Sequence, residues 1–281
     1  MSTAQAQEQV IACVRCQGRG VIFDPEVPVG RHGVLKLCAC TQELCQCGGQ
    51  PPFQYWDDES HRQYCSCAAT RRQLNHLSRL FAAADLPSRF RWKFRADFAW
   101  SVPGSGAPLR VTRKVRPVLD YLGAVLEDGG EPRRGYLLHG PPGTGKTLLA
   151  SVILNELVLH RGRPGRFLNL SRKYFQQLRD TYSTGSEQYG KTWQIMQELC
   201  EMPYLIIDDF GVQRGTDWEM EMLYDLVDAR YADERLTVVT TNKLVSDIQQ
   251  LSDGRIYSRL VEMCYMVDMD GDDYRLHTQS A

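Results

Sequence analysis

The sequence predicts an α/β fold in which helices flank a parallel sheet, with a small cysteine-rich domain ahead of it. After residue 135, short apolar runs alternate with segments of helical periodicity, the pattern of parallel strands joined by crossover helices. Before residue 68, the chain is rich in cysteine and poor in apolar residues. Its 281 residues and 43% hydrophobic content allow two unequal domains, which we expect at 1–70 and 109–281 with a basic, aromatic linker over 71–108.

A glycine-rich turn at residues 139–147 is the most specific motif of the chain. It follows the apolar run Tyr136–Leu138 and precedes an apolar helical segment, and its letters HGPPGTGKT contain the complete GxxxxGK[ST] pattern. In such a loop, backbone N–H groups surround phosphates, a lysine reaches the β and γ oxygens, and a hydroxyl ligates Mg²⁺. A chance turn is the weaker interpretation. The expected nucleoside triphosphate site comprises Gly140, Pro141, Pro142, Gly143, Thr144, Gly145, Lys146, Thr147 and Leu148.

The remaining elements follow from hydrophobic periodicity and boundary residues. Helices are expected at 111–126, 148–160, 171–182, 191–201 and 243–251. Strands are expected at 136–138, 166–170, 204–207 and 236–242. The alternation of cations and rings over Arg89–Arg95 has period two, which favours a half-buried strand, although cations beside stackable rings also suit single-stranded nucleic acid.

Two aspartates at the end of an apolar strand give the second strong signal. Asp208 and Asp209 follow Tyr204–Ile207, and a strand end places them beside the phosphate loop. Asp208 can then complete the Mg²⁺ shell while Asp209 orients an attacking water, which are roles that need two carboxylates. A simple aspartate turn is the alternative. Asn242, after the next strand, can point at the γ-phosphate, cap the following helix, or do both.

Eight of the ten cysteines form four close pairs that predict two tetrahedral zinc sites. A disulfide framework would need an oxidising compartment, and an iron–sulfur cluster is a further alternative. The spacing leaves open which pair joins which, and His61 could replace one sulfur. The two remaining cysteines, Cys200 and Cys264, are expected to be buried apolar residues. The expected ligands are Cys13, Cys16, Cys38, Cys40, Cys45, Cys47, Cys65 and Cys67.

Charge is distributed unevenly along the chain despite a formal net charge of −1. Residues 71–116 contain 11 basic and 2 acidic residues, whereas residues 117–281 contain 17 and 25. The basic band is a possible electrostatic footprint for nucleic acid. The first nine residues lack the basic and apolar regions of a signal peptide, and no apolar run reaches membrane-spanning length. We therefore expect a cytoplasmic protein without a membrane partner.

Taken together, Gly140–Thr147, Leu205–Gly211, Thr240–Asn242, Arg255–Leu260 and Gly271–Arg275 resemble the DnaC/DnaI/IstB branch of the AAA+ ATPases. This resemblance covers roughly residue 86 to the end of the sequence. It implies a P-loop sheet without a helical lid, ATP as the nucleotide, Asn242 as sensor 1 and Arg275 as sensor 2. It also implies an arginine finger, expected at Arg259 with Arg255 as the alternative, although two arginines four apart on a helix also suit surface ion pairs. A finger supplied to a neighbouring subunit would make hydrolysis depend on assembly.

The same branch places a single-stranded DNA contact in the helix after the second strand. The candidate contacts here are Arg172, Lys173, Tyr174 and Arg179. Tyr174, Phe175 and Leu178 also have the helical spacing of core residues, and at least two of the three are expected to be packed.

Three functions can be built on this domain. The first is an oligomeric ATPase that loads a replicative helicase onto single-stranded DNA, with the cysteine-rich domain holding the helicase, as in the DnaI-type loaders that the domain order resembles. The second is an IstB-like helper of a transposase that remodels duplex DNA. The third, a small-molecule kinase, is disfavoured by Asp208, Asp209 and Asn242. A cysteine-rich DNA reader is disfavoured by the acidic composition of that segment. We expect the first function.

Overall fold

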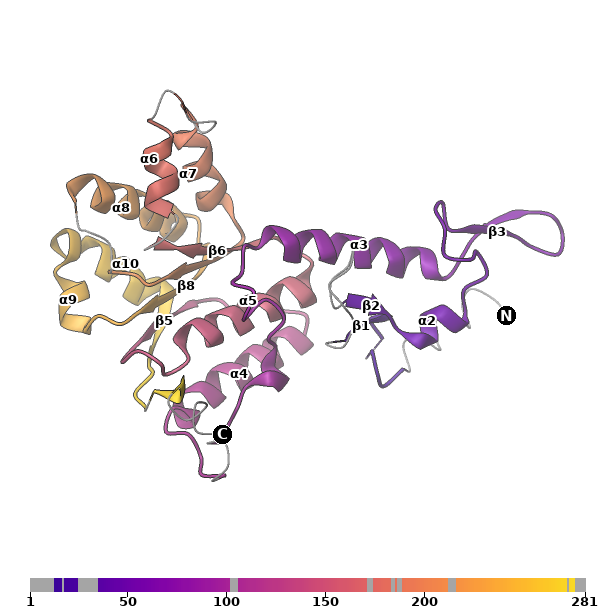
Figure 1. The fold of residues 1–281 in the computed structure, drawn as a ribbon, viewed down its shortest axis with the longest axis horizontal. Helices are drawn as coiled ribbons and strands as arrows, with labels where there is room; N and C mark the ends of the chain where they lie inside the picture. Colours follow the sequence, from indigo (N-terminus) through magenta and orange to yellow (C-terminus); the bar gives the residue numbers. More distant parts are fainter. Residues whose placement is uncertain are drawn as a thin grey trace. The chain divides into compact units, whose positions relative to one another are not determined.

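The computed structural model describes residues 13–16, 18–24, 35–101, 106–170, 174–182, 185, 189–211, 216–271 and 273–275. The chain divides into two compact units, Met1–Ala82 and Ala83–Ala281 (Figure 1). None of the described helices combines the length and the apolar composition that a bilayer crossing requires.

The described residues of the smaller unit form two antiparallel strand pairs, a short helix and a long helix. Strand β1 (Val21–Phe23) pairs antiparallel with β2 (Leu35–Leu37), and β3 (Gln54–Trp56) pairs antiparallel with β4 (Arg62–Tyr64). A short helix, α2 (Ala39–Glu43), follows β2, and α3 (Cys67–Ala83) follows β4. Helix α3 buries an apolar stripe in which the Phe81 ring packs edge-on against Phe23 at 6.3 Å. This core is small, and cross-links are an expected source of stability for a unit of this size.

The larger unit is built on the predicted parallel sheet. Its strands have the spatial order β6-β7-β8-β5-β9, and all four neighbouring pairs are parallel. A parallel sheet is buried on both faces, which explains the nearly continuous apolar runs in these strands. Because all five strands run the same way, the residues that follow them meet at one edge. The strands are β5 (Gly135–His139), β6 (Gly165–Asn169), β7 (Tyr204–Asp208), β8 (Leu236–Thr241) and β9 (Cys264–Asp268).

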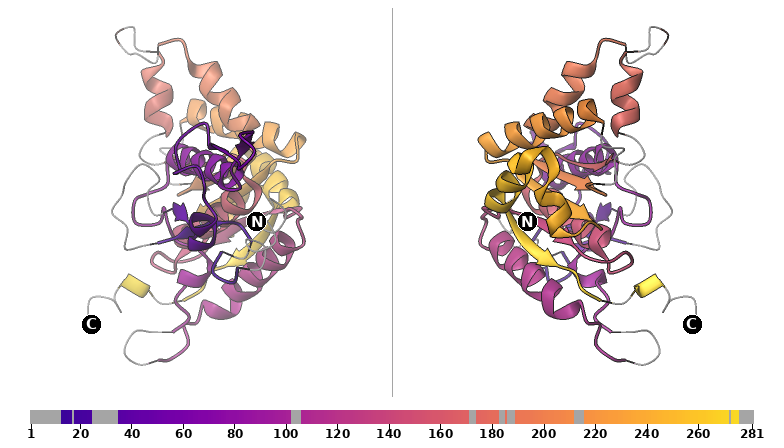
Figure 2. Two further views of the ribbon diagram at one scale, coloured as in Figure 1. Left: turned by 90° about the vertical axis from the view of Figure 1, so that its right-hand side faces the viewer. Right: turned by 90° about the vertical axis from the view of Figure 1, so that its left-hand side faces the viewer.

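Helices cover both faces of this sheet. The crossover from β5 to β6 runs along the sheet in the opposite direction to the later ones, so right-handed connections place α5 (Lys146–Arg161) on one face and α8 (Asp217–Ala232) and α10 (Arg255–Met263) on the other. Helix α4 (Thr112–Glu127) packs beside α5, and α7 (Thr192–Glu201) packs beside α8. Helices α6 (Phe175–Asp180) and α7 project beyond the sheet (Figures 1 and 2).

The region before α4 differs from the sequence prediction. Residues Arg89–Arg95 form turns followed by the short 3₁₀ helix η1 (Arg95–Asp97), so the predicted strand is wrong. Besides local turn hydrogen bonds, this segment is held by α5: the Asn155 amide donates to the Phe90 and Lys93 carbonyls at 3.0 and 2.7 Å, and Glu156 accepts from the Arg95 N–H at 2.9 Å. These hydrogen bonds take the place of those that a strand would make with a neighbouring strand.

The loop after β8 also differs. Helix α9 (Val245–Gln249) has Leu244 at its N-cap, so Asn242 does not cap this helix. A second short 3₁₀ helix, η3 (Leu251–Gly254), then leads into α10.

A fully buried arginine joins three elements on the α8 face. Arg230, at the end of α8, has no exposed surface, and burial lowers its pKa to about 9. Its guanidinium donates to the carbonyls of Leu199, Cys200 and Met202 at the end of α7 and to the Leu236 carbonyl and Thr237 hydroxyl of β8. A cation at the end of a helix satisfies carbonyls that have no partner within it. The chain then enters β7, whose far end carries Asp208.

Candidate nucleotide-binding site and metal centres

The phosphate loop connects strand β5, which lies between β8 and β9, to α5. Helix α5 begins at Lys146, after Gly145 with φ +94°, a conformation that glycine adopts without strain. Gly143 also has a positive φ, and a Cβ atom there would lie 1.9 Å from the Asp273 carboxylate. The Tyr274 N–H donates to the Gly143 carbonyl at 3.1 Å. The described C-terminal residues therefore lie against this loop, and Gly143 cannot be exchanged for a larger residue without displacing them.

The Lys146 ammonium group is turned toward its own loop. It donates to the carbonyls of Gly140 and Pro141 at 2.8 and 2.6 Å, and the residue is 7% exposed. Burial lowers its pKa to about 8, and the nearby Arg275 acts in the same direction, while Asp209 and Asp208 oppose the shift. A phosphate group at this position would supply the anionic partner that the two carbonyls only partly replace.

Asp208 receives three hydrogen bonds from three different elements. Its Oδ1 accepts from the Thr147 hydroxyl at 3.0 Å and from the Thr240 hydroxyl at 2.7 Å, and its Oδ2 accepts from the Asn169 amide at 3.3 Å. The carboxylate is 4% exposed, and burial raises its pKa despite the Thr240 and Thr147 hydrogen bonds. A buried carboxylate beside the Thr147 hydroxyl is a donor set that suits Mg²⁺, whose charge would compensate the burial. When bound there, Mg²⁺ would neutralise part of the phosphate charge.

Asp209 has a different environment. Its backbone is held in the left-handed region, with φ +59°, and its N–H donates to the Thr240 hydroxyl at 3.1 Å. The Asn169 amide also donates to its carboxylate at 3.5 Å. A side chain held at the strand end without deep burial can act on a water molecule beside the phosphates. Asn242 lies one residue beyond β8 at the same edge of the sheet, and it is exposed.

Two residues of this site were not assigned to it from the sequence. Asn169 ends β6 and donates to both aspartates, and Thr240 donates to Asp208 and accepts from the Asp209 backbone. Their signal was partly available, because each stands at the carboxyl end of an expected strand, but only the structure shows that both strands neighbour β7.

The arginines expected near the γ-phosphate lie in two places. Arg275 is exposed, follows the loop contact of Tyr274, and acts electrostatically on Lys146. Arg255 and Arg259 lie on α10, where both guanidinium groups stack on the Tyr224 ring at 4.7 and 5.0 Å. Arg259 also pairs with Asp228 and donates to the Tyr224 hydroxyl at 3.0 Å. In this single chain Arg259 is thus held by α8, and Arg255 is the more exposed of the two.

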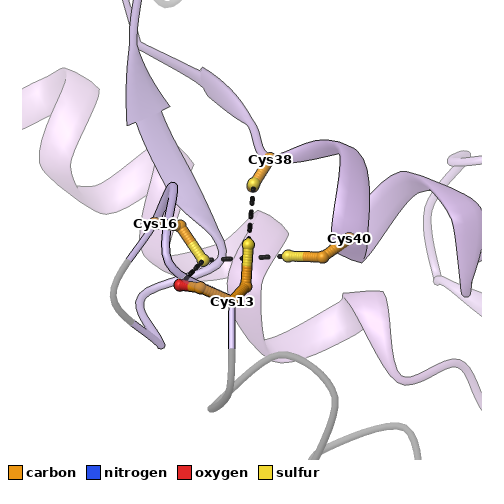
Figure 3. Close-up of side chains that lie close together, drawn as sticks. All are labelled: Cys13, Cys16, Cys38 and Cys40. Atoms are coloured by element: carbon orange, nitrogen blue, oxygen red, sulfur yellow. Dashed lines mark hydrogen bonds between the residues drawn. The ribbon is translucent and has the colours of Figure 1, made fainter.

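The eight N-terminal cysteines gather into two clusters within the smaller unit. Cys13, Cys16, Cys38 and Cys40 form the first cluster (Figure 3), and Cys45, Cys47, Cys65 and Cys67 form the second. The ligand atoms of each cluster all lie within 4.8 Å of one another. The sequence left open which close pairs of cysteines share a site. In the structure the first pair along the chain joins the second, and the third joins the fourth. His61 lies outside both clusters, beside Asp57 and Glu59, so it replaces no sulfur.

The geometry of both clusters fits a tetrahedral metal ion. The shortest sulfur–sulfur separations are 3.7 Å in the first cluster and 3.5 to 3.6 Å in the second. A zinc ion with Zn–S bonds of ~2.3 Å separates its thiolates by roughly 3.8 Å, whereas a disulfide bond is about 2.05 Å. All of these cysteines are free thiols. Two four-sulfur sites compatible with zinc are therefore present, in a unit whose apolar core is small.

The expected DNA contacts are only partly described. Arg172 and Lys173 lie outside the described residues. Tyr174 is fully buried and donates its hydroxyl to the Met196 sulfur, so the structure contradicts its assignment as a DNA contact. Its neighbours Phe175 and Leu178 are also buried, which confirms the packing expected from their spacing. Arg179 is half exposed, and its guanidinium donates to the buried Glu219 carboxylate at 3.0 Å.

Comparison with known families connects these features. The profile of the IstB-like ATP binding protein family matches residues 131–281, more than half of the chain, and this range contains the phosphate loop, both aspartates and all three arginines. The chain belongs to this IstB-like family. The larger unit is accordingly an ATP-binding P-loop domain of the AAA+ type, and ATP with Mg²⁺ is the ligand pair that its site fits.

Relatives of this IstB-like chain include a replicative helicase loader and a protein in an insertion sequence. The replicative helicase loader DnaC of Escherichia coli is 29% identical over 126 residues, which are 44% of this chain and 49% of that protein. A protein in an insertion sequence of Mycobacterium tuberculosis is 29% identical over 154 residues, 53% of this chain and 57% of that protein. The chain thus spans about half the length of these two relatives.

Solved structures confirm the fold of the larger unit. The DnaC helicase loader superposes with a TM-score of 0.51 at 20% identity, over 66% of this chain and 100% of that chain. DnaI superposes with the same score at 18% identity, over 66% of this chain and 95% of that chain.

Proposed function

We propose that this chain is an oligomeric ATPase that loads a replicative DNA helicase onto single-stranded DNA. The observation that carries the proposal is the arrangement of Lys146, Thr147, Asp208 and Asp209 at one sheet edge, in an IstB-like domain preceded by a separate unit with two cysteine clusters. In this proposal, nucleotide chemistry belongs to the larger unit and partner binding to the smaller one. The similarity to DnaC supports a helicase as the partner.

In this proposal the chain's own residues divide the work. Lys146 leaves the carbonyls of Gly140 and Pro141 to hold the phosphates, while Thr147 and Asp208 hold the metal ion. Asp209 and Asn242 orient the attacking water at the exposed side. Arg259 reaches the γ-phosphate of a neighbouring subunit after leaving Asp228, and Arg275 reports on the phosphates of its own subunit. Zinc in both clusters shapes the surface that holds the helicase.

The loading reaction can be reconstituted. Full-length protein, the replicative helicase of the same organism and a circular single-stranded DNA are mixed with ATP, and DNA-bound helicase is measured after gel filtration. We expect ATP-dependent loading by the wild type and none by Lys146→Ala, whereas Arg133→Ala, which removes an exposed cation just before β5 and outside the basic band, should behave as the wild type. A helicase that neither binds the protein nor gains DNA would refute the proposal.

The trans-acting arginine has its own test. Arg259→Ala should bind ATP normally but lose the part of the ATPase rate that rises with protein concentration. Intact activity per molecule would assign the finger to another residue, with Arg255 examined next.

A second function is supported by the insertion-sequence relative. An IstB-like transposition helper would protect duplex DNA in the presence of ATP and retain a transposase. Footprinting on duplex DNA with ATP separates the two functions, because a helicase loader acts on single strands.

A further inference from the structure

A cation contacts the second cysteine cluster from within α3. Arg71 lies one helical turn after Cys67, so both side chains share a face of the helix. Its Nε donates to the Cys67 sulfur at 3.3 Å, and its Nη2 approaches the Cys45 sulfur at 3.9 Å. One guanidinium therefore bridges a cysteine on the helix and a cysteine in the preceding loop.

The position of this guanidinium is fixed by two further residues. The Phe53 ring lies beneath it, with the guanidinium carbon 5.8 Å from the ring centre. Gly49 also lies against it, and a Cβ atom at that position would stand 2.6 Å from the Arg71 Nη2. Gly49 also has φ +77°, so both its backbone and its close approach to Arg71 favour glycine.

The chemistry of the cluster explains what such a cation does. Four thiolates around a divalent ion carry a formal charge of about −2, and a guanidinium that touches two of them offsets part of it. A sulfur that accepts a charged hydrogen bond is also a weaker nucleophile, because the lone pair is already engaged. The Gln46 N–H adds a third donor, to Cys65 at 3.4 Å.

We propose that Arg71 is the positioning residue of a metal site at Cys45, Cys47, Cys65 and Cys67, and that it protects the Cys45 and Cys67 thiolates from electrophiles. Burial does not distinguish the two clusters, since each contains two buried and two half-buried cysteines. The first cluster is therefore an internal reference for the second. The inference is independent of the helicase function, but it does require a bound metal.

Alkylation of the full-length metal-loaded protein tests the proposal. Bound metal is first measured by mass spectrometry, with two ions per chain expected. N-ethylmaleimide is then added. A thiolate sulfur forms a bond to one alkene carbon, the other carbon takes a proton from water, and the alkylated cysteine leaves the metal. Released metal is followed with a colorimetric chelator, and labelled cysteines are located by peptide mapping.

Three variants define the outcome. Arg71→Ala should raise the labelling rate of Cys45 and Cys67 about tenfold, the factor that corresponds to one charged hydrogen bond, while leaving the first cluster unchanged. Arg71→Lys keeps the positive charge but not the planar guanidinium with its several N–H donors, and it should recover part of the protection. Arg72→Ala removes the same charge from the neighbouring exposed position and should have no effect.

Three results would overturn the proposal. Equal labelling rates for Arg71→Ala and the wild type would show that Arg71 does not protect the sulfurs. If Arg71→Ala raised the labelling rates of both clusters equally, and Arg71→Lys did the same, Arg71 would only support the fold of the unit. Absence of metal at the outset would refute the metal site itself, without bearing on ATP binding or helicase loading.

Discussion

The ionisation of Lys146 makes ATP affinity depend on pH. Burial lowers the pKa of this lysine to about 8, so the free protein loses the ammonium proton as the pH rises through that value. The phosphates bind the protonated form, and ATP binding must therefore be accompanied by proton uptake above pH 8. Affinity should be highest below pH 8 and should fall as the solution becomes more alkaline.

The size of the effect follows from the pKa. The protonated fraction of Lys146 is roughly three quarters at pH 7.5 and roughly one tenth at pH 9, so the Kd for ATP should rise about eightfold over this interval. The lower limit of pH 7.5 avoids titration of the nucleotide itself. His139 does not interfere, because burial lowers its pKa further below this range.

Two measurements check this prediction. Titration with a fluorescent ATP analogue gives the Kd at each pH, and calorimetry in two buffers of different ionisation enthalpy gives the number of protons taken up. Lys114→Ala serves as a control, since it removes an exposed lysine of α4 and should leave the pH profile unchanged. A Kd that stays constant from pH 7.5 to 9, with no proton uptake, would refute the reasoning.

Three other predictions concern a buried arginine, a residue of the metal-binding edge of the ATP site, and the cysteine clusters. Arg230→Met should lower the free energy of unfolding by about 4 kcal/mol, because several buried carbonyls lose a charged donor. Denaturant titration measures this loss, with the exposed Arg133→Met as the control. An equal loss in both variants would contradict the prediction. Asn169→Ala should weaken Mg²⁺-dependent ATP binding by about tenfold at an unchanged melting temperature, and equal Mg²⁺ dependence would count against the role of Asn169. Chelation under reducing conditions should abolish amide protection in residues 35–82 while ATP binding persists, and simultaneous loss of both would argue against two separately stable units.

Much of the ATP-binding domain could be predicted because its signals are local. The phosphate loop and the apolar strand before Asp208 each depend on adjacent residues, and the structure places Thr147 and Asp208 within 3.0 Å of each other. The cluster pairing could not be predicted, since it depends on the hairpin of β1 and β2, which brings Cys13 beside Cys38. Spacing alone contains no such information.

The segment Arg89–Arg95 shows why alternation can mislead. Its rings are half-buried, as the alternation suggests, but its carbonyls are satisfied by Asn155, more than 60 residues away, and no neighbouring strand is involved. Tyr174 was misassigned for a related reason. A tyrosine can contact DNA or fill a core, and the complete burial of Tyr174, with its hydroxyl on the Met196 sulfur, decides for the core.

The strand order has a consequence for synthesis of the protein. Strand β5, which leads into the phosphate loop, lies between β8 and β9, and both of these neighbours follow it in the sequence by about 100 residues or more. Before a nascent chain on the ribosome has reached Asp268, strand β9 is missing and β5 has a neighbour on one side only. The phosphate loop then follows a strand that is not yet fully paired. The cysteine clusters, by contrast, need only the first 67 residues. Metal capture can thus precede nucleotide capture, and the ATP site becomes competent only when nearly all of the described chain has emerged.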